Sequence, residues 1–176
     1  VHTEPSGAIW AGGEFGLARL VPERPDRFDP VPAPSGMPER VVSLFQDRDG
    51  TLWAGSWKGL HRIQHGPDGP YLGPPMPGIE TEVDAIAQDR EGFLWIGTHR
   101  ELALVDIAQD RVTARFTRGV TSDDPHIQAL MVDRAGRLWV GSRSGLCHLA
   151  LEASPERDSS CEQLYTIRHG LPSSWI

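Results

Sequence analysis

Four tryptophans, Trp10, Trp53, Trp95 and Trp139, mark a unit that the sequence repeats at intervals of 43, 42 and 44 residues. In every copy an acid stands six positions before the tryptophan, a glycine three before it, a glycine two after it and a leucine seven after it. A period of about 40–45 residues built from short strands is typical of β-propellers. In the last three copies the acid, glycine, tryptophan and glycine columns hold Asp47, Gly50, Trp53, Gly55, Asp89, Gly92, Trp95, Gly97, Asp133, Gly136, Trp139 and Gly141.

Each column fits one step of an antiparallel sheet. Residues 41–46 and 83–88 are β-prone runs that end at the acid, and the D-x-x-G segment that follows predicts a tight turn. The tryptophan strand, as in LWIG, is apolar on both faces, so we expect both faces to be buried. A G-L pair then begins a third strand, and a more variable fourth strand follows, at 112–116 in the third copy and 163–167 in the last.

We therefore predict an all-β fold: a β-propeller with four blades of four-stranded antiparallel sheets, centred on the four repeated tryptophans, as part of a larger propeller. A solenoid such as a β-helix is the alternative, but its repeats are normally shorter.

The consensus D-R-x-G-x-L-W-x-G-[ST]-x-x-G-L resembles the two-component regulator propeller repeat, in four copies that cover the chain. That family forms the extracytoplasmic sensor region of bacterial hybrid histidine kinases and related signalling proteins. The resemblance implies a periplasmic or other extracytoplasmic location, a downstream transmitter domain, and a membrane connection only through segments outside this chain. In the third copy Glu101 replaces the glycine before the repeated leucine, so that turn must differ or be strained.

The two ends of the chain align with the same part of the repeat. Ile176 corresponds to Val42 and Val1 to Leu44, so residues 1–176 form one propeller segment whose ends both fall within an inner strand. We favour an excerpt of a longer propeller, in which further blades are partners. The alternative is that the two ends meet, in one molecule or between two copies of the chain.

The charge and the motifs exclude several functions. The formal net charge is −7 and the 17 Lys and Arg residues are scattered, which argues against a nucleic-acid partner. Metal-binding, nucleotide-binding and nucleophile motifs are missing, so we expect no cofactor and no catalytic role. Asp47 to Gly50 resemble the start of a calcium loop, but a structural turn explains them better.

The chain has two cysteines, Cys147 in the predicted third strand of the last blade and Cys161 at the start of its fourth. Antiparallel neighbours joined by a loop can bring these residues opposite each other, within disulfide reach. A disulfide would agree with an oxidising compartment, and two free thiols in a reducing one are the alternative.

The turn between the second and third strands varies from copy to copy within a constant framework, as in a recognition surface. It holds Glu14, Trp57, Lys58, His99, Arg100 and Arg143, and Arg40, His126 and Trp175 precede or begin inner strands at the same rim. Trp57 could stack on a sugar while basic groups bind hydroxyls or carboxylates; it could equally cover a seam between blades.

We interpret the chain as a ligand-sensing, extracytoplasmic propeller of a bacterial signal-transduction protein that recognises a carbohydrate or related small molecule. One alternative is a scaffold for protein–protein interaction, and a second is an enzyme similar to the streptogramin lyases.

Overall fold

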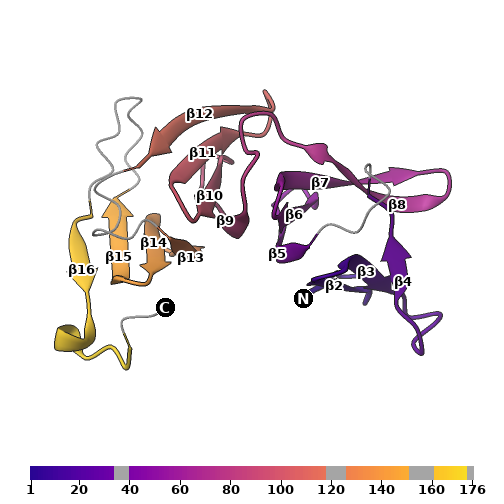
Figure 1. Ribbon diagram of the computed structural model, residues 1–176, viewed down its shortest axis with the longest axis horizontal. Coiled ribbons are helices and arrows are strands. Elements are labelled where there is room, and N and C mark those ends of the chain that lie inside the picture. Colours follow the sequence, from indigo (N-terminus) through magenta and orange to yellow (C-terminus); the bar gives the residue numbers. More distant parts are fainter. Residues whose placement is uncertain (34–39, 118–125, 151–160, 174–176) are drawn as a thin grey trace. The chain divides into compact units, whose positions relative to one another are not determined.

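Four four-stranded antiparallel sheets, each folded in chain order, make up the computed structural model, which describes residues 1–33, 40–117, 126–150 and 161–173 (Figure 1). They are the blades of a β-propeller, as the repeat predicts. The chain divides into two units, residues 1–83 and 84–176. Within the described residues, no helix is long and apolar enough to cross a membrane.

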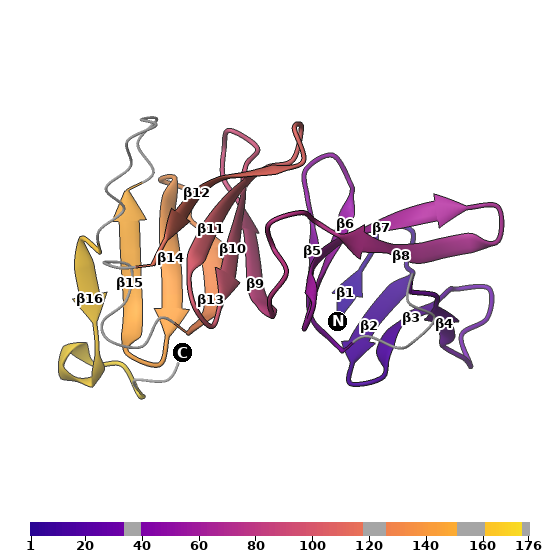
Figure 2. The same cartoon turned by 45° about the horizontal axis from the view of Figure 1, so that its top comes forward.

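The first unit contains two blades (Figure 2). The first blade consists of β1 (His2–Thr3), β2 (Ile9–Gly13), β3 (Gly16–Leu20) and β4 (Asp29–Val31). The second consists of β5 (Val41–Gln46), β6 (Leu52–Ser56), β7 (Gly59–Gly66) and β8 (Gly69–Pro75). The core between these blades contains Trp10 and Leu17 from the first and Leu52, Ala54, Ile63 and Leu72 from the second.

The second unit is built in the same way. Its first blade consists of β9 (Val83–Gln88), whose first residue closes the first unit, β10 (Leu94–Thr98), β11 (Leu102–Asp106) and β12 (Arg111–Phe116). The last blade consists of β13 (Ile127–Val132), β14 (Arg137–Ser142), β15 (Gly145–Ala150) and β16 (Gln163–Tyr165). The core between them joins Trp95, Leu102 and Leu104 to Leu138, Val140, Cys147 and Leu149.

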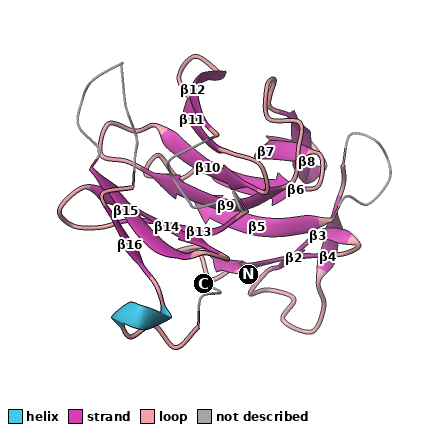
Figure 3. Ribbon diagram, turned by 60° about the vertical axis from the view of Figure 1, so that its left-hand side comes forward, coloured by secondary structure: helices cyan, strands magenta, loops and turns pink. Residues whose placement is uncertain are grey.

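The predicted inner strands at 41–46 and 83–88 are confirmed, but the last outer strand is shorter than the sequence suggested. It ends at Tyr165 and is followed by the 3-10 helix η1 (Ile167–His169), the only helix in the described part of the chain (Figure 3). Thr166 caps this helix, because its side chain accepts a hydrogen bond from the Arg168 amide, and Gly170 ends it at φ 91°.

A disulfide joins Cys147 to Cys161, with 5.8 Å between the Cα atoms. The pairing is the one that the sequence suggested, but its local geometry differs from the expectation. Leu164, not Cys161, lies opposite Cys147 in the sheet, and Cys161 precedes β16. The disulfide therefore ties the segment before β16 to the buried middle strand of the blade. The chain ends expected within inner strands include Trp175 and Ile176, which lie outside the described residues.

Candidate functional site

The repeated acid and the repeated tryptophan form one hydrogen-bonded unit in all four blades. Asp47 Oδ1 accepts the amides of Asp49 and Thr51 at 3.0 and 2.8 Å, as expected of a turn cap, while Oδ2 accepts the indole Nε1–H of Trp53 at 2.8 Å. The same indole bond runs from Trp95 to Asp89 (3.0 Å), from Trp139 to Asp133 (2.9 Å) and from Trp10 to Glu4 (2.7 Å). Sequence reasoning missed this bond, although the constant spacing between acid and tryptophan was its signal.

These hydrogen bonds give the D-x-x-G turns a structural role, because each turn is joined to the tryptophan of its own blade. Hydrogen bonds from the Trp139 indole and from the Arg137 amide lower the pKa of Asp133 well below its usual range. For Glu4, burial raises the pKa, but hydrogen bonds from Ser6 and Trp10 and the charge of Arg19 outweigh it, so the net shift is downward.

Among the described residues, no group of three or more metal-binding side chains could hold an ion.

In the first three blades, the glycine two positions after the tryptophan lets the next inner strand approach. A Cβ atom built on Gly12 would lie 2.9 Å from the carbonyl oxygen of Val41, and one on Gly97 would lie 2.5 Å from the Ile127 side chain. No side chain fits in that space, so the column is glycine for packing reasons.

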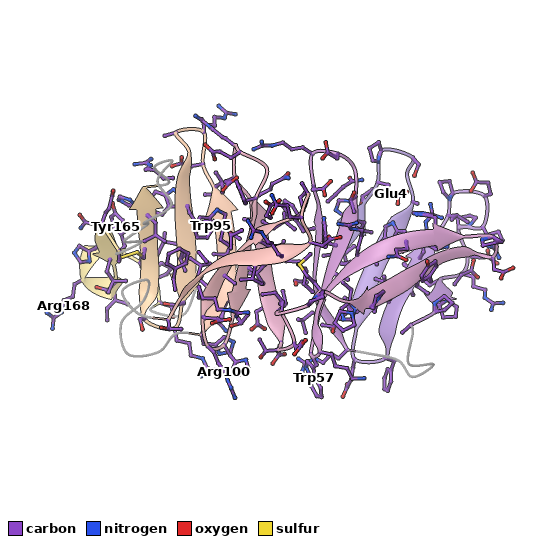
Figure 4. All side chains as sticks on the ribbon, turned by 90° about the horizontal axis from the view of Figure 1, so that it is seen from above. Glu4, Trp57, Trp95, Arg100, Tyr165 and Arg168 are labelled. Atoms are coloured by element: carbon purple, nitrogen blue, oxygen red, sulfur yellow. A yellow bond between two sulfur atoms is a disulfide. The ribbon has the colours of Figure 1, made fainter. Side chains whose placement is uncertain are left out.

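The variable turns between the second and third strands of the blades form a rim in each unit. In the first unit, this rim is centred on Trp57, in the turn between β6 and β7. This side chain is 54% exposed and points away from the ribbon (Figure 4). Its amide donates a hydrogen bond of 3.2 Å to the Arg40 carbonyl, and the Arg40 guanidinium lies 4.9 Å from the centre of the Trp57 ring. Two residues that were predicted to share a rim, from different segments, are thus in contact.

Buried polar groups support this turn from below. Ser56 Oγ accepts the amide of Lys58 at 3.0 Å and lies 2.8 Å from Nε2 of His61. His61 is fully buried, and its Nδ1 lies 2.9 Å from the Gly73 carbonyl oxygen. The buried His61 and Ser56 therefore form a hydrogen-bonded base under the turn that carries Trp57 and Lys58.

The turn between β2 and β3 carries the exposed Glu14 and a feature that sequence reasoning did not select. Phe15 is 85% exposed, the most exposed aromatic side chain in the described part of the chain. Its signal was available, because an aromatic residue in a short turn between strands has no packing role. The rim of the first unit thus carries two exposed aromatic residues together with Arg40 and Lys58.

In the second unit, the turn between β10 and β11 meets the residue that precedes β13. The rings of His99 and His126 lie edge to face with 6.5 Å between their centres. His126 Nε2 lies 3.4 Å from Oδ2 of Asp84, and Arg100 Nε donates to His99 Nε2 at 3.1 Å. Asp84 was not predicted; the only hint was a carboxylate near the start of a largely apolar strand.

Two further residues lie in the variable turns of the second unit: Glu101, in the same turn as His99, and Arg143. Glu101 adopts a negative φ, because Thr98 Oγ1 accepts the amides of Arg100 and Glu101 at 3.1 and 3.0 Å and shapes a turn that needs no glycine. The expectation that this turn differs is confirmed. Arg143 is exposed in the turn between β14 and β15. The structure thus places Glu14, Arg40, Trp57 and Lys58 on the first unit and His99, Arg100, His126 and Arg143 on the second.

Comparison with known sequences bears out the repeat. A family model described as the two component regulator propeller matches residues 35–58, 77–100 and 121–144. Each match begins before an inner strand and extends into the variable turn. No curated protein matches the chain.

Solved structures share the fold at low sequence identity. The extracellular domain of a protein described as a hybrid two component system from B. thetaiotaomicron aligns with a TM-score of 0.75 at 19% identity, over 97% of this chain and 23% of that one. A second extracellular domain, from a protein described as a one component system of the same organism, gives 0.69 at 22% identity, over 96% and 23%.

The fold is also that of an enzyme. A catalytically inactive form of virginiamycin B lyase from Staphylococcus aureus, with quinupristin, aligns with a TM-score of 0.61 at 12% identity, over 85% of this chain and 51% of that one. All three likenesses concern the fold. The chain spans about a quarter of the length of the two extracellular domains.

Proposed function

Because this chain carries the repeats of the two component regulator propeller family, we propose that it is an extracytoplasmic, ligand-sensing propeller segment of a bacterial signal-transduction protein. Its ligand is a carbohydrate or a related small molecule, and its role is binding and not catalysis. Further blades and a downstream transmitter belong to the same protein. The extracellular domains that share its fold are about four times as long as this chain, in keeping with such an assembly.

The exposed Trp57 on its rigid turn is the observation that supports this proposal. Trp57 presents a large exposed ring on a turn that Ser56 and His61 fix, so the ring is available to a partner without rearrangement of the turn. Sugars present apolar C–H faces that stack on aromatic rings. The Arg40 guanidinium covers part of the ring, and more than half of the side chain remains open for such stacking.

Basic side chains beside the ring favour an acidic or hydroxyl-rich ligand. Arg40 holds its guanidinium at the ring and Lys58 follows Trp57 directly in the chain. Guanidinium and ammonium groups donate to carboxylates and hydroxyls, and the guanidinium does so in bidentate geometry. Uronic acids and their oligosaccharides combine both features.

The test is calorimetric titration of a panel of neutral and uronic-acid oligosaccharides into the protein and its Trp57→Ala variant. We expect at least one acidic sugar to bind, and the variant to bind it about tenfold or more weakly, a loss of roughly 1.4 kcal/mol. Phe28→Ala removes an exposed aromatic residue away from the rim and serves as the matched control. A panel without any binder would contradict a sugar ligand and favour the protein scaffold.

A further inference from the structure

The third strand of the second blade carries a buried histidine where the other blades carry small residues. His61 lies on β7 and is fully buried, and the same repeat position holds Ala18, Ala103 and Cys147. Its partner across the sheet, Ala54, belongs to the core between the first two blades. Three blades of the same fold are built without an imidazole at this position, so the fold of the blade does not require one.

The hydrogen bonds of His61 indicate a neutral ring. Nδ1 lies 2.9 Å from the carbonyl oxygen of Gly73, and a carbonyl can only accept, so Nδ1 carries a proton. A charged ring would be costly in this fully buried position, and in the neutral ring the other nitrogen, Nε2, is an acceptor. Ser56 Oγ lies 2.8 Å from Nε2, so the hydroxyl donates to the ring.

The Ser56 hydroxyl joins this ring to the turn that carries Trp57. Its oxygen accepts the Lys58 amide at 3.0 Å, while its hydrogen is donated to His61. The hydrogen bonds therefore run without interruption from the rim turn, through the ring, to Gly73 on the outer strand β8.

The equivalent hydroxyls of the second unit are bonded differently. Thr98 and Ser142 also accept an amide of their turn, but each donates to a carbonyl oxygen in that same turn, Thr98 to Glu101 and Ser142 to Gly145. Those turns are closed by their own backbone. In the second blade, a titratable side chain takes the place of that carbonyl.

We propose that His61 is a positioning residue for the Trp57 ring, and that it holds the turn only while its imidazole is uncharged. A proton on Nε2 removes the acceptor of the Ser56 hydroxyl and places a positive charge in a fully buried position. Presentation of Trp57 therefore weakens as the pH falls through the range of about 8 to 5, in which imidazoles take up protons. The inference rests on the proposed function, because it concerns the regulation of the same site.

The charged groups on the elements around His61 are basic, already paired or exposed to solvent. Arg19 of the first blade forms an ion pair with Glu4 at 3.2 Å. Glu14, in the turn of the first blade, is exposed, so solvent screens its charge. The turn above the ring and the adjoining strands contribute cations, which are Arg40, Lys58 and Arg62. A proton on His61 therefore adds positive charge to a largely basic environment, which makes the charged state less favourable.

The test measures the hydrogen-exchange protection factor of the Lys58 amide, which donates to Ser56, at about pH 8 and about pH 5. In the unaltered protein we expect this factor to be about tenfold or more lower at the acidic pH. His61→Gln keeps a donor and an acceptor but cannot be charged, so its protection factor should be the same at both pH values. His61→Ala, which introduces the residue of the first and third blades, should give low protection at both. His65→Gln removes an exposed histidine from the same strand and should behave like the unaltered protein.

The same proteins, each first shown to be folded by circular dichroism, are titrated with trigalacturonic acid. Its affinity should fall about tenfold or more between the two pH values for the unaltered protein and for His65→Gln, but not for His61→Gln. A protection factor that does not change with pH in the unaltered protein, or that falls equally in His61→Gln, would overturn the positioning role.

The two measurements separate this inference from the proposed function. The expected exchange results without any binding of trigalacturonic acid would uphold the positioning role and count against the sugar ligand. Binding that His61→Ala leaves unchanged at the higher pH would overturn the positioning role and leave the sugar ligand in place.

Discussion

At the scale of single residues, the carboxylate before the tryptophan strand performs two tasks at once. Asp89 Oδ1 accepts the Phe93 amide at 2.9 Å and so closes the turn, while Oδ2 binds the indole of the fully buried Trp95. The indole N–H would otherwise be a buried donor without a partner, and that costs free energy. The spacing of acid and tryptophan is therefore as important as either residue.

We expect Asp89→Ala to lower the free energy of unfolding by about 2–4 kcal/mol, because it removes the acceptor of both the Phe93 amide and the buried Trp95 indole. Urea denaturation followed by circular dichroism measures the change. Glu91→Ala removes the same charge from an exposed position in the same turn and should cost less than about 0.5 kcal/mol. Equal effects of the two substitutions would show that charge, and not the indole bond, stabilises the turn.

At the scale of the elements, the turn between the second and third strands has two solutions. In the second blade Gly59 has a φ of 141°, and a Cβ atom there would collide with the Ile79 carbonyl. In the third blade the turn is held by Thr98 and by an ion pair between Glu101 and Arg115. A substitution toward the repeat consensus therefore has no reason to help at position 101.

We predict that Gly59→Ala destabilises the protein by about 1–3 kcal/mol, through backbone strain and the clash. Glu101→Gly, which restores the consensus, should also destabilise, by roughly 0.5–1 kcal/mol, because glycine gains freedom in the unfolded chain and the ion pair is lost. Thermal unfolding of both variants and of the unaltered protein measures the order of their stabilities. A rise in Tm for Glu101→Gly would contradict this account of the turn.

The sequence predicted the framework well and the local detail less well. The period, the inner strands at 41–46 and 83–88 and the pairing of the cysteines are all in the structure, because each rests on a pattern repeated along the chain or on a single possible pair. The η1 helix after Tyr165 was missed, although Thr166 and Gly170 are recognisable cap residues. The contact of Asp84 with His126 was not predictable, since it joins side chains about 40 positions apart.

At the scale of the whole molecule, stability and pH are linked through the carboxylates of the turns. Hydrogen bonds hold the pKa of Asp133 in the folded protein well below the value of about 3.9 that an unfolded chain has. A group whose pKa is lowered on folding stabilises the native state above the unfolded-state pKa, and this contribution is lost as the pH falls toward the folded-state pKa. Glu4, with a pKa shifted in the same direction, adds to the effect.

We therefore expect the free energy of unfolding to fall as the pH is lowered from about 5 to 3, with a smaller slope for Asp133→Asn. Urea denaturation at several pH values measures both slopes. At neutral pH the variant should be less stable than the parent, because a neutral amide accepts weaker hydrogen bonds. Parallel pH profiles for the two proteins would mean that other groups dominate the acid response.

The unequal burial of the tryptophans gives the protein an optical reporter of its own. Trp10, Trp53 and Trp95 are shielded from solvent, whereas Trp57 projects from its turn. A dissolved collisional quencher reaches an indole only where water does, so among these four it will dim the emission of Trp57 first. A ligand that covers the first-unit rim will restore that emission, and its occupancy can be followed by fluorescence without a label or an added chromophore.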